Sequence, residues 1–391
     1  MSRSADQSSS DSWTQRLKGR RSRPEEWLAE KAIFLVSLSA ILLIFLIFAF
    51  VLRESFPVFA GRLDSSYNVK IIQPADMDKH SAAELRDYLE LTPAEFEQLD
   101  REQLQLMLEV KVEAAAEIPE DKDAKLNTTR WRMLIGPYQW TGYERPEFIW
   151  QPVSEIQKYN IVPLLLGSLK ATFTAMLFAV PLALAAAIYV SQIAGARTRE
   201  FLKPAIEMLA GIPSVVLGFF ALIVMASFLQ QLFGYESRLN AFVAGIALGL
   251  AIVPIVFSIA EDAMTSVPGG YREAALALGA SRWQAAWQVV LPAALPGVFA
   301  AIVLGFGRAI GETMIVLMAS GNASIMSLSL TDSARTITAT IAAELAEAVF
   351  GGTRYRILFM LGTLLFAVTF LSNLVAELII HRLKSRLEGM K

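Results

Sequence analysis

Six apolar stretches, each about as long as a membrane-spanning helix, constrain the fold of this 391-residue chain more than any other feature. About 20 apolar residues in a helix cross the roughly 30 Å hydrocarbon core of a bilayer. A mean hydropathy of +0.45 and a charged content of only 18% also indicate a membrane protein. Lys170 adjoins the second stretch, where we expect its flexible stem to reach the interface. The sequence predicts an all-α membrane protein with six transmembrane helices, at residues 32–52, 171–190, 208–229, 239–260, 291–321 and 357–376.

The segments between these stretches divide the chain into five parts. The first helix is too long for the apolar core of a secretory signal, and Arg53 and Glu54 follow it directly, so we expect it to be retained. The predicted parts are a disordered cytoplasmic tail at 1–31, a first transmembrane helix at 32–52, an external acidic helical insert at 53–162, a membrane core with five transmembrane helices at 163–382 and a cytoplasmic tail at 383–391.

The distribution of lysine and arginine predicts the orientation of the helices, because cytoplasmic loops carry an excess of both residues. The segments 1–31, 191–204, 262–290 and 381–391 together hold sixteen of them. The short segments 234–238 and 322–356 hold four. We therefore expect both termini and the loop around Arg282 in the cytoplasm, and the insert outside.

The insert at 53–162 is acidic, with thirteen Lys and Arg against twenty Asp and Glu. Ser81 and Glu84 have the spacing of a capping box, in which each side chain bonds the other residue's backbone N–H. Apolar residues follow at helical spacing, which predicts a small helical subdomain. It serves either as a solvated spacer or as a docking platform for an external partner, and the sequence leaves both interpretations open.

Several kinds of chemistry are excluded by residues that the chain lacks. It has no cysteine, which removes disulfides, thiolate zinc sites and a cysteine nucleophile. Its two histidines, His80 and His381, are far apart in sequence, so neither a histidine metal cluster nor a Ser-His-Asp triad is expected. A net charge of −2 argues against nucleic acid as a partner. No G-x-x-x-x-G-K-[ST] loop occurs, so any ATP chemistry would belong to another chain.

One charged, alanine-rich segment, YREAALALGASRWQAAWQVVLP at 271–292, separates two apolar stretches on the cytoplasmic side. Its first residues favour helix, and Gly279 accommodates the left-handed conformation that ends a helix. Ser281 and Gln284 have the spacing of a capping box that starts another. The segment is predicted to form two short helices that meet at a glycine and project as a compact, partly apolar knob.

This segment resembles the EAA loop of ABC-importer permeases. The matching residues are Glu273, Ala274, Ala275, Gly279, Val289, Leu291 and Pro292. The resemblance implies a MetI-like permease core, and a loop helix that docks into a groove of a cytoplasmic ATPase and transmits its closure to the membrane helices. It assigns ATPase coupling to Glu273, Ala274, Ala275 and Gly279.

Further stretches resemble one branch of that family, the C-type permease subunits of phosphate-specific importers. They are LLLGSLKATF at 164–173, GIPSVVLGFF at 211–220, PGGYREAALALGASRWQ at 268–284, GRAIGETM at 307–314 and RTITATIAAELAEA at 335–348. The resemblance implies import of inorganic phosphate across the inner membrane of a bacterium, with this chain as half of the pathway. It implies as partners a second permease subunit, a pair of ATPase subunits that bind ATP and Mg, an external phosphate-binding protein and membrane lipids. This chain would be a transport subunit rather than an enzyme and would bind no cofactor. The long insert departs from the family, whose usual member has a much shorter loop there.

Two regions of the membrane core are candidate gates. Gly211 and Pro213 are predicted inside one span, where a proline frees a carbonyl and glycines permit close approach of helices. They form either a bend or an ordinary packing face. Apolar residues that recur every four positions over 337–349 predict a short amphipathic helix near the outer surface, which either closes the path or packs under the insert. Because this helix follows Arg335 directly, we count Arg335 with Gly211 and Pro213 as possible gate residues.

Arg308 and Glu312 are the only charged residues in the stretch 291–321. In a continuous helix they would lie on one face. An arginine inside a span costs at least about 2.5–3.5 kcal/mol on insertion scales, so Arg308 should face protein or water. One interpretation is an internal salt bridge that fixes helix packing. The other, which the resemblance of the GRAIGE stretch also favours, is a cation that pairs with phosphate while Glu312 holds it when the path is empty.

The sequence leaves other functions open. A permease for another oxyanion, such as molybdate, sulfate or phosphonate, would carry the same EAA loop, since this loop does not contact substrate. A membrane sensor or scaffold subunit would use the acidic insert to detect a ligand and would transport nothing. An anion path needs a cation inside a span, such as Arg308, whereas a sensor does not. A membrane enzyme is a third alternative, weakened by the lack of a His, Cys or paired-carboxylate constellation.

Overall fold

The computed structural model describes residues 24–63, 72, 74–89, 91, 93–116, 123, 126–154 and 156–388. The chain divides into two compact units, residues 1–53 and residues 54–391. Most of the tail predicted to be disordered, residues 1–23, lies outside the described residues. Helix α2 (Pro24–Phe59) begins earlier than predicted, so residues 24–31 are helical rather than disordered.

Six helices of the described residues are long and apolar enough to cross a membrane, which confirms the predicted number of spans. They are Trp27–Phe59, Val162–Ile193, Ser214–Phe233, Ala241–Thr265, Arg282–Gly311 and Thr353–Arg382. The last belongs to α17 (Thr353–Glu388), which continues through most of the predicted C-terminal tail. The predicted stretch 208–229 begins too early, because its first two residues belong to a separate helix, α8 (Ala196–Leu209).

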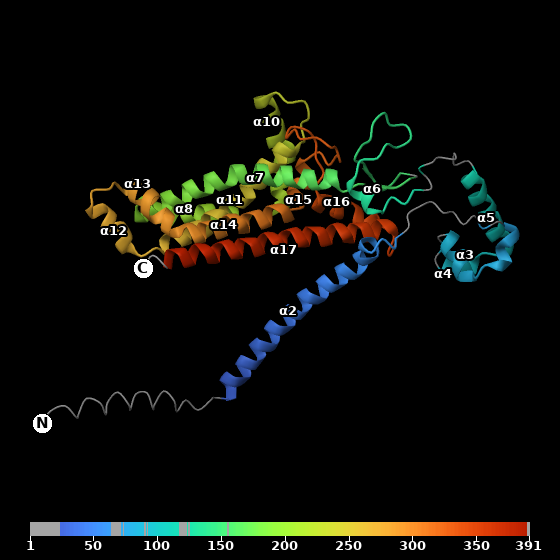
Figure 1. The fold of residues 1–391 in the computed structure, drawn as a ribbon, viewed down its shortest axis with the longest axis horizontal. Helices are drawn as coiled ribbons and strands as arrows, with labels where there is room; N and C mark the ends of the chain where they lie inside the picture. The colour runs from blue at the N-terminus through green and yellow to red at the C-terminus, as the bar shows by residue number, and fades with distance from the viewer. Residues whose placement is uncertain are drawn as a thin grey trace. The chain divides into compact units, whose positions relative to one another are not determined.

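Four helices lie side by side and form the membrane core (Figure 1): α7 (Val162–Ile188), α11 (Ala241–Thr265), α14 (Leu291–Gly311) and α17. Buried alanines recur every four residues along α7, at positions 171, 175, 179, 183 and 187. Inside a bilayer, helices associate through close packing, and small side chains let their backbones approach. At Gly249 on α11, an added Cβ would come within 2.9 Å of the Phe178 ring on α7. Larger side chains on this face would therefore push the two helices apart.

The third span contains a π-helical turn, and the chain breaks directly after the fifth span. The third span consists of α9 (Ser214–Phe220), a π-helical turn η3 (Ala221–Met225) and α10 (Ala226–Phe233). The chain breaks after α14 and resumes as α15 (Met314–Ala319), which packs on α9 and α11. An extended segment then leads to α16 (Ile337–Glu344) and a 3-10 turn η5 (Leu345–Glu347). Broken helices occur at membrane depth where the backbone is buried in protein or lines a cavity.

The described part of the insert is mostly helical, as predicted. A 3-10 turn η1 (Pro74–Lys79) precedes α3 (Ala82–Leu89), α4 (Pro93–Gln98) and α5 (Arg101–Ala116). These elements share a small apolar core of their own around Leu85, Leu89 and Leu108. The predicted capping box starts α3: Glu84 N donates to Ser81 Oγ at 3.3 Å, and Ser81 N donates to Glu84 Oε2 at 3.1 Å.

The last part of the insert contains a feature that an all-α prediction missed. After α6 (Trp131–Ile135), a short antiparallel ribbon pairs β1 (Trp150–Gln151) with β2 (Lys158–Tyr159). The paired Trp150 and Tyr159 are both buried, with ring centroids 5.7 Å apart. Burial raises the pKa of the Tyr159 hydroxyl well above its usual range. The aromatic pair stabilises a ribbon that is otherwise only two residues long.

Candidate functional site

The coupling segment, residues 266–290 between α11 and α14, folds into two helices that meet at a glycine, as predicted. Helix α12 (Gly269–Ala277) is followed by Gly279, whose φ of +88° is left-handed and is adopted readily by glycine. Helix α13 (Arg282–Ala285) begins with the predicted capping box, because Gln284 N donates to Ser281 Oγ at 3.2 Å and Ser281 N donates to Gln284 Oε1 at 2.8 Å. A π-helical turn, η4 (Ala286–Val290), leads into α14.

The residues predicted to couple to an ATPase lie on α12 and in the turn that follows it. Glu273 and Ala274 are exposed, whereas Ala275 is only 9% exposed and packs inward. Gly279 sits in the exposed turn, and a Cβ added there would meet nothing within 4 Å. Glu273, Ala274 and the Gly279 turn are therefore accessible to another chain, while Ala275 seats the helix.

The coupling segment also presents an apolar surface. Leu278, at the turn, is 90% exposed. Trp283 and Trp287 stack with ring centroids 5.9 Å apart and an interplanar angle of 18°, and both remain more than half exposed. Exposed leucine and tryptophan side chains clustered on one projecting segment are typical of a protein or membrane interaction surface.

Arg308 and Glu312 do not share a helical face, contrary to the prediction. Arg308 lies in the last turn of α14, but the helix ends at Gly311, and Glu312 is extended with φ −70° and ψ 135°. The Glu312 carbonyl accepts a 2.8 Å hydrogen bond from Thr338 Oγ1 instead. Arg308 is exposed, and within the described part of the chain no carboxylate lies within 4 Å of its guanidinium. These residues therefore form no internal salt bridge.

Gly211 and Pro213 lie in the break between α8 and α9, not inside a span as predicted. Pro213 immediately precedes the first residue of α9, so its missing N–H removes no helical hydrogen bond and introduces no kink. Farther along, Gly218 is buried against α15, and an added Cβ would come within 2.7 Å of Met318 Sδ. The bend expected within the helix is absent, and the two candidate gate residues form a turn at the start of a span.

Arg335 precedes α16 and is held by a buried carboxylate. Its Nη2 lies 2.8 Å from Glu344 Oε1, while Trp150 Nε1 and Arg354 Nε donate to the same side chain at 2.9 and 3.4 Å. The carboxylate of Glu344 thus joins Arg335 and Arg354, which flank α16, to Trp150, which lies 194 positions earlier in the chain. The predicted apolar repeat does not reach Val349, which is 79% exposed, because α16 has already ended.

Lys170 was wrongly expected to reach the interface. It is 6% exposed, and its Nζ donates to the backbone carbonyls of Ser327 and Ser329 at 3.0 and 2.7 Å. A buried ammonium needs such acceptors to offset its lost hydration. Lys170 therefore ties the segment after α15 to α7, a role that its position at the edge of the predicted apolar stretch did not indicate.

Glu261, near the end of α11, was not singled out in the sequence and is fully buried. Its carboxylate accepts hydrogen bonds from Arg199 Nη2 and Lys203 Nζ of α8, both at 2.6 Å, and from Thr265 Oγ1 at 3.0 Å. Hydrogen bonds to Asp262 and Glu261 raise the pKa of Lys203, so its ammonium stays charged. This cluster clamps α8 to the end of α11 from which the coupling segment starts.

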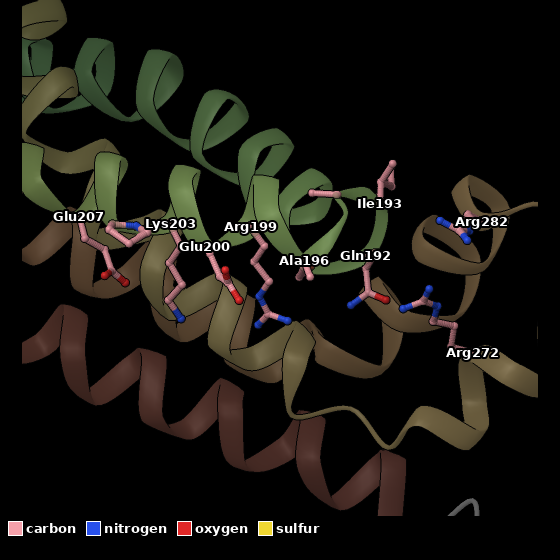
Figure 2. A pocket seen from close by; sticks show the side chains of 12 residues that line it. Gln192, Ile193, Ala196, Arg199, Glu200, Lys203, Glu207, Arg272 and Arg282 are labelled. Atoms are coloured by element: carbon pink, nitrogen blue, oxygen red, sulfur yellow. The ribbon is translucent and has the colours of Figure 1, made fainter.

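A cavity of about 680 Å³ opens beside this clamp (Figure 2). It is bounded by α8, by the π-helical turn η2 (Tyr189–Ile193) that follows α7, and by the coupling segment. Four cationic side chains line it, namely Arg199, Lys203, Arg272 and Arg282. Sequence spacing did not indicate this cavity, because its walls come from three separate parts of the chain.

The fold and the coupling segment define the membrane-spanning component of a transport system. The sequence model of the family described as "Binding-protein-dependent transport system inner membrane component" matches residues 179–388, more than half of the chain. The chain belongs to this family, as the EAA resemblance predicted, and is a multi-pass inner-membrane protein.

Relatives and a solved structure are similar to parts of the chain. It is 38% identical to "Probable ABC transporter permease protein YqgH" of Bacillus subtilis (strain 168), over 60% of this chain and 76% of that protein. It is 33% identical to "Phosphate transport system permease protein PstC" of Pasteurella multocida (strain Pm70), over 62% of this chain and 80% of that protein. A MetNI methionine ABC transporter in an inward-facing conformation is similar at 20% identity with a TM-score of 0.44, over 57% of this chain and 94% of that chain.

Proposed function

We propose that this chain is the permease subunit of an ATP-driven importer of inorganic phosphate and forms half of the translocation pathway. Family membership supports the transport role. Two relatives named as phosphate transport permeases, which the chain matches over 80% and 77% of their length, support phosphate as the substrate. The structure adds an unpaired arginine, Arg308, that lies inside an apolar span.

The observation that carries the proposal is the exposed, unpaired guanidinium of Arg308 in an otherwise apolar span. Contact with lipid would cost about 2.5–3.5 kcal/mol or more, so another protein or water must cover this face. A second permease subunit that completes the pathway would provide that cover. A planar guanidinium can then bind a tetrahedral oxyanion through paired hydrogen bonds.

The remaining partners follow from the same arrangement. A pair of ATPase subunits, which carry ATP and Mg, would dock on Glu273, Ala274 and the turn at Gly279. An external phosphate-binding protein would deliver the substrate on the opposite side, and lipids would surround the spans. Both termini would then be cytoplasmic.

In this proposal the candidate gate residues act at the ends of helices. Arg335, held by Glu344, would fix the entry to α16 in the present conformation. Gly211 and Pro213 would allow α9 to pivot against α8, because the chain between these helices is a turn rather than a continuous helix.

The test is phosphate uptake by the complex of this chain with its partner subunits, reconstituted in vesicles. Arg308→Gln should lower uptake by about tenfold or more, because it removes a charge-assisted contact to the anion. Assembly should be unchanged, since Arg308 holds no partner within the described residues. Arg238→Gln, the same change at an exposed arginine outside the spans, serves as the control.

Undiminished uptake by the Arg308→Gln complex would remove this residue from the pathway. Uptake of molybdate, sulfate or phosphonate in preference to phosphate would show that the chain is a permease for another oxyanion. A complex that binds an external ligand and transports no anion would be a sensor rather than a permease.

A further inference from the structure

We propose that the cavity between α8, η2 and the coupling segment is a binding site for a phosphate group. The group would belong either to free inorganic phosphate or to the headgroup of an anionic phospholipid. This site is distinct from Arg308 and does not depend on which anion the chain transports.

The first argument is a glutamine side chain that lines the cavity and has no protein partner in the described part of the chain. Gln192 is only 9% exposed and lines the cavity. Figure 2 shows its side chain between Arg199 and Arg272. Within the described residues, this amide makes no hydrogen bond to another part of the chain. The amide atoms remain accessible from the cavity, so they are free to form hydrogen bonds with a ligand there. It belongs to the π-helical turn η2, a kind of irregularity that often marks functional sites.

The second argument is an excess of free cations next to this amide. Arg272 and Arg282, both from the coupling segment, line the cavity. In the part of the chain that the structure describes, neither guanidinium has a carboxylate within 4 Å. By contrast, Arg199 and Lys203 of α8, which also line the cavity, form ion pairs with Glu261. A guanidinium donates paired hydrogen bonds that match phosphate geometry, and an amide N–H can add another.

The carboxylates that line the cavity lie away from Gln192, Arg272 and Arg282. Glu200 and Glu207 also line it, but both belong to α8. Figure 2 shows them beside Lys203, whereas Gln192, Arg272 and Arg282 lie at the opposite end. The anion should therefore bind among Gln192 and the two arginines. At about 680 Å³ the cavity is also large enough for a phosphate diester with its substituents.

A phosphate group bound here would connect two parts of the molecule. It would join Gln192, at the end of a membrane helix, to Arg272 and Arg282 on the coupling segment. Occupancy would then hold the coupling segment against the end of α7.

The experiment has two arms that separate the sources of the phosphate group. In the first, the purified full chain in dodecyl maltoside micelles, which contain no phosphate, is titrated with radiolabelled inorganic phosphate by equilibrium dialysis. Arg308→Gln is present throughout, so that binding in the proposed pathway does not contribute. In the second, the chain is placed in phosphatidylcholine nanodiscs containing phosphatidylglycerol without free phosphate, and native mass spectrometry counts the retained phosphatidylglycerol.

The variants are Gln192→Leu, Arg272→Gln and Arg282→Gln. Each should weaken binding by about tenfold, because each removes a hydrogen bond to a charged group. The matched control is Arg197→Gln, an exposed arginine of α8 that does not line the cavity, and its binding should equal that of the parent. Arg282 is exposed, so Arg282→Gln remains informative even if Gln192→Leu fails to fold.

Saturable binding in the first arm that is lost in these variants identifies free phosphate as the ligand. Retention of phosphatidylglycerol in the second arm with the same losses identifies the lipid headgroup. Binding in neither arm, or binding that Arg272→Gln and Arg282→Gln leave at the parent level, would overturn the proposal.

Discussion

The hydroxyl of Ser168 on α7 accepts a 3.0 Å hydrogen bond from the backbone N–H of Ile337, the first residue of α16. One residue earlier, Gly167 lies directly against the backbone carbonyl of Arg335, and an added Cβ would overlap with that carbonyl. These two contacts fix the entry to α16 against a membrane helix. The position of Arg335 therefore depends on the absence of a side chain at residue 167.

Gly167→Ala should displace the backbone at Arg335 and lower the stability of the chain by about 1–3 kcal/mol, the usual effect of overpacking. Thermal unfolding of the purified chain in detergent measures this. Gly195→Ala is the control, because its Cβ would meet nothing within 4 Å. Equal unfolding temperatures for the two variants would show that the contact at Gly167 relaxes without strain.

Gly279→Val should prevent the left-handed turn of the coupling segment, at a strain of about 1–3 kcal/mol. Membrane insertion should persist while ATP hydrolysis in the reconstituted complex no longer drives uptake. Gly142→Val is a matched control, since Gly142 has nearly the same φ of +87° but lies in the external insert. The coupling role fails if the Gly279→Val complex still transports at the parental rate per ATP hydrolysed.

Glu261→Gln should loosen α8 from α11, because Arg199 and Lys203 lose their common buried carboxylate. Breaking a fully buried pair costs about 3–5 kcal/mol, and the partial exposure of both cations reduces the expected loss to about 1–3 kcal/mol. The free energy of unfolding in detergent, compared with that of the exposed-site variant Glu236→Gln, gives the difference. A loss no larger than that of the control would mean that the clamp contributes nothing to stability.

The proposed orientation predicts which side of the membrane each loop faces. The native chain has no cysteine, so single cysteines can be introduced without background. A membrane-impermeant maleimide should label Glu102→Cys in spheroplasts and should label Leu278→Cys only after permeabilisation, since both positions are exposed. Labelling of position 278 from outside would reverse the orientation.

The sequence by itself determined the features that depend on residues close together along the chain. Six runs of apolar residues specified six spans, because the thickness of a bilayer converts directly into a helix length. The turn at Gly279 and the capping boxes at Ser81 and Ser281 were also predicted correctly. Each of these involves only a few consecutive residues, whose backbone hydrogen bonds do not depend on the rest of the molecule.

The tertiary structure decided which distant residues meet. Glu261 pairs with Arg199 across 62 positions, and Lys170 reaches Ser327 across 157. Both pairings follow from which helix faces pack together. Small residues such as the alanines of α7 let helices pack closely but do not specify which faces meet, so the sequence alone did not reveal these pairings.

Arg308 and Glu312 show the same limit within a single span. Their spacing of four residues places them on one face only if the helix is continuous. The helix ends between them, and Thr338, 26 positions beyond Glu312, bonds the carbonyl at the break. This break, which a hydrogen bond from a distant segment accompanies, is not visible in the spacing of the residues, so the unpaired state of Arg308 was apparent only in the folded chain.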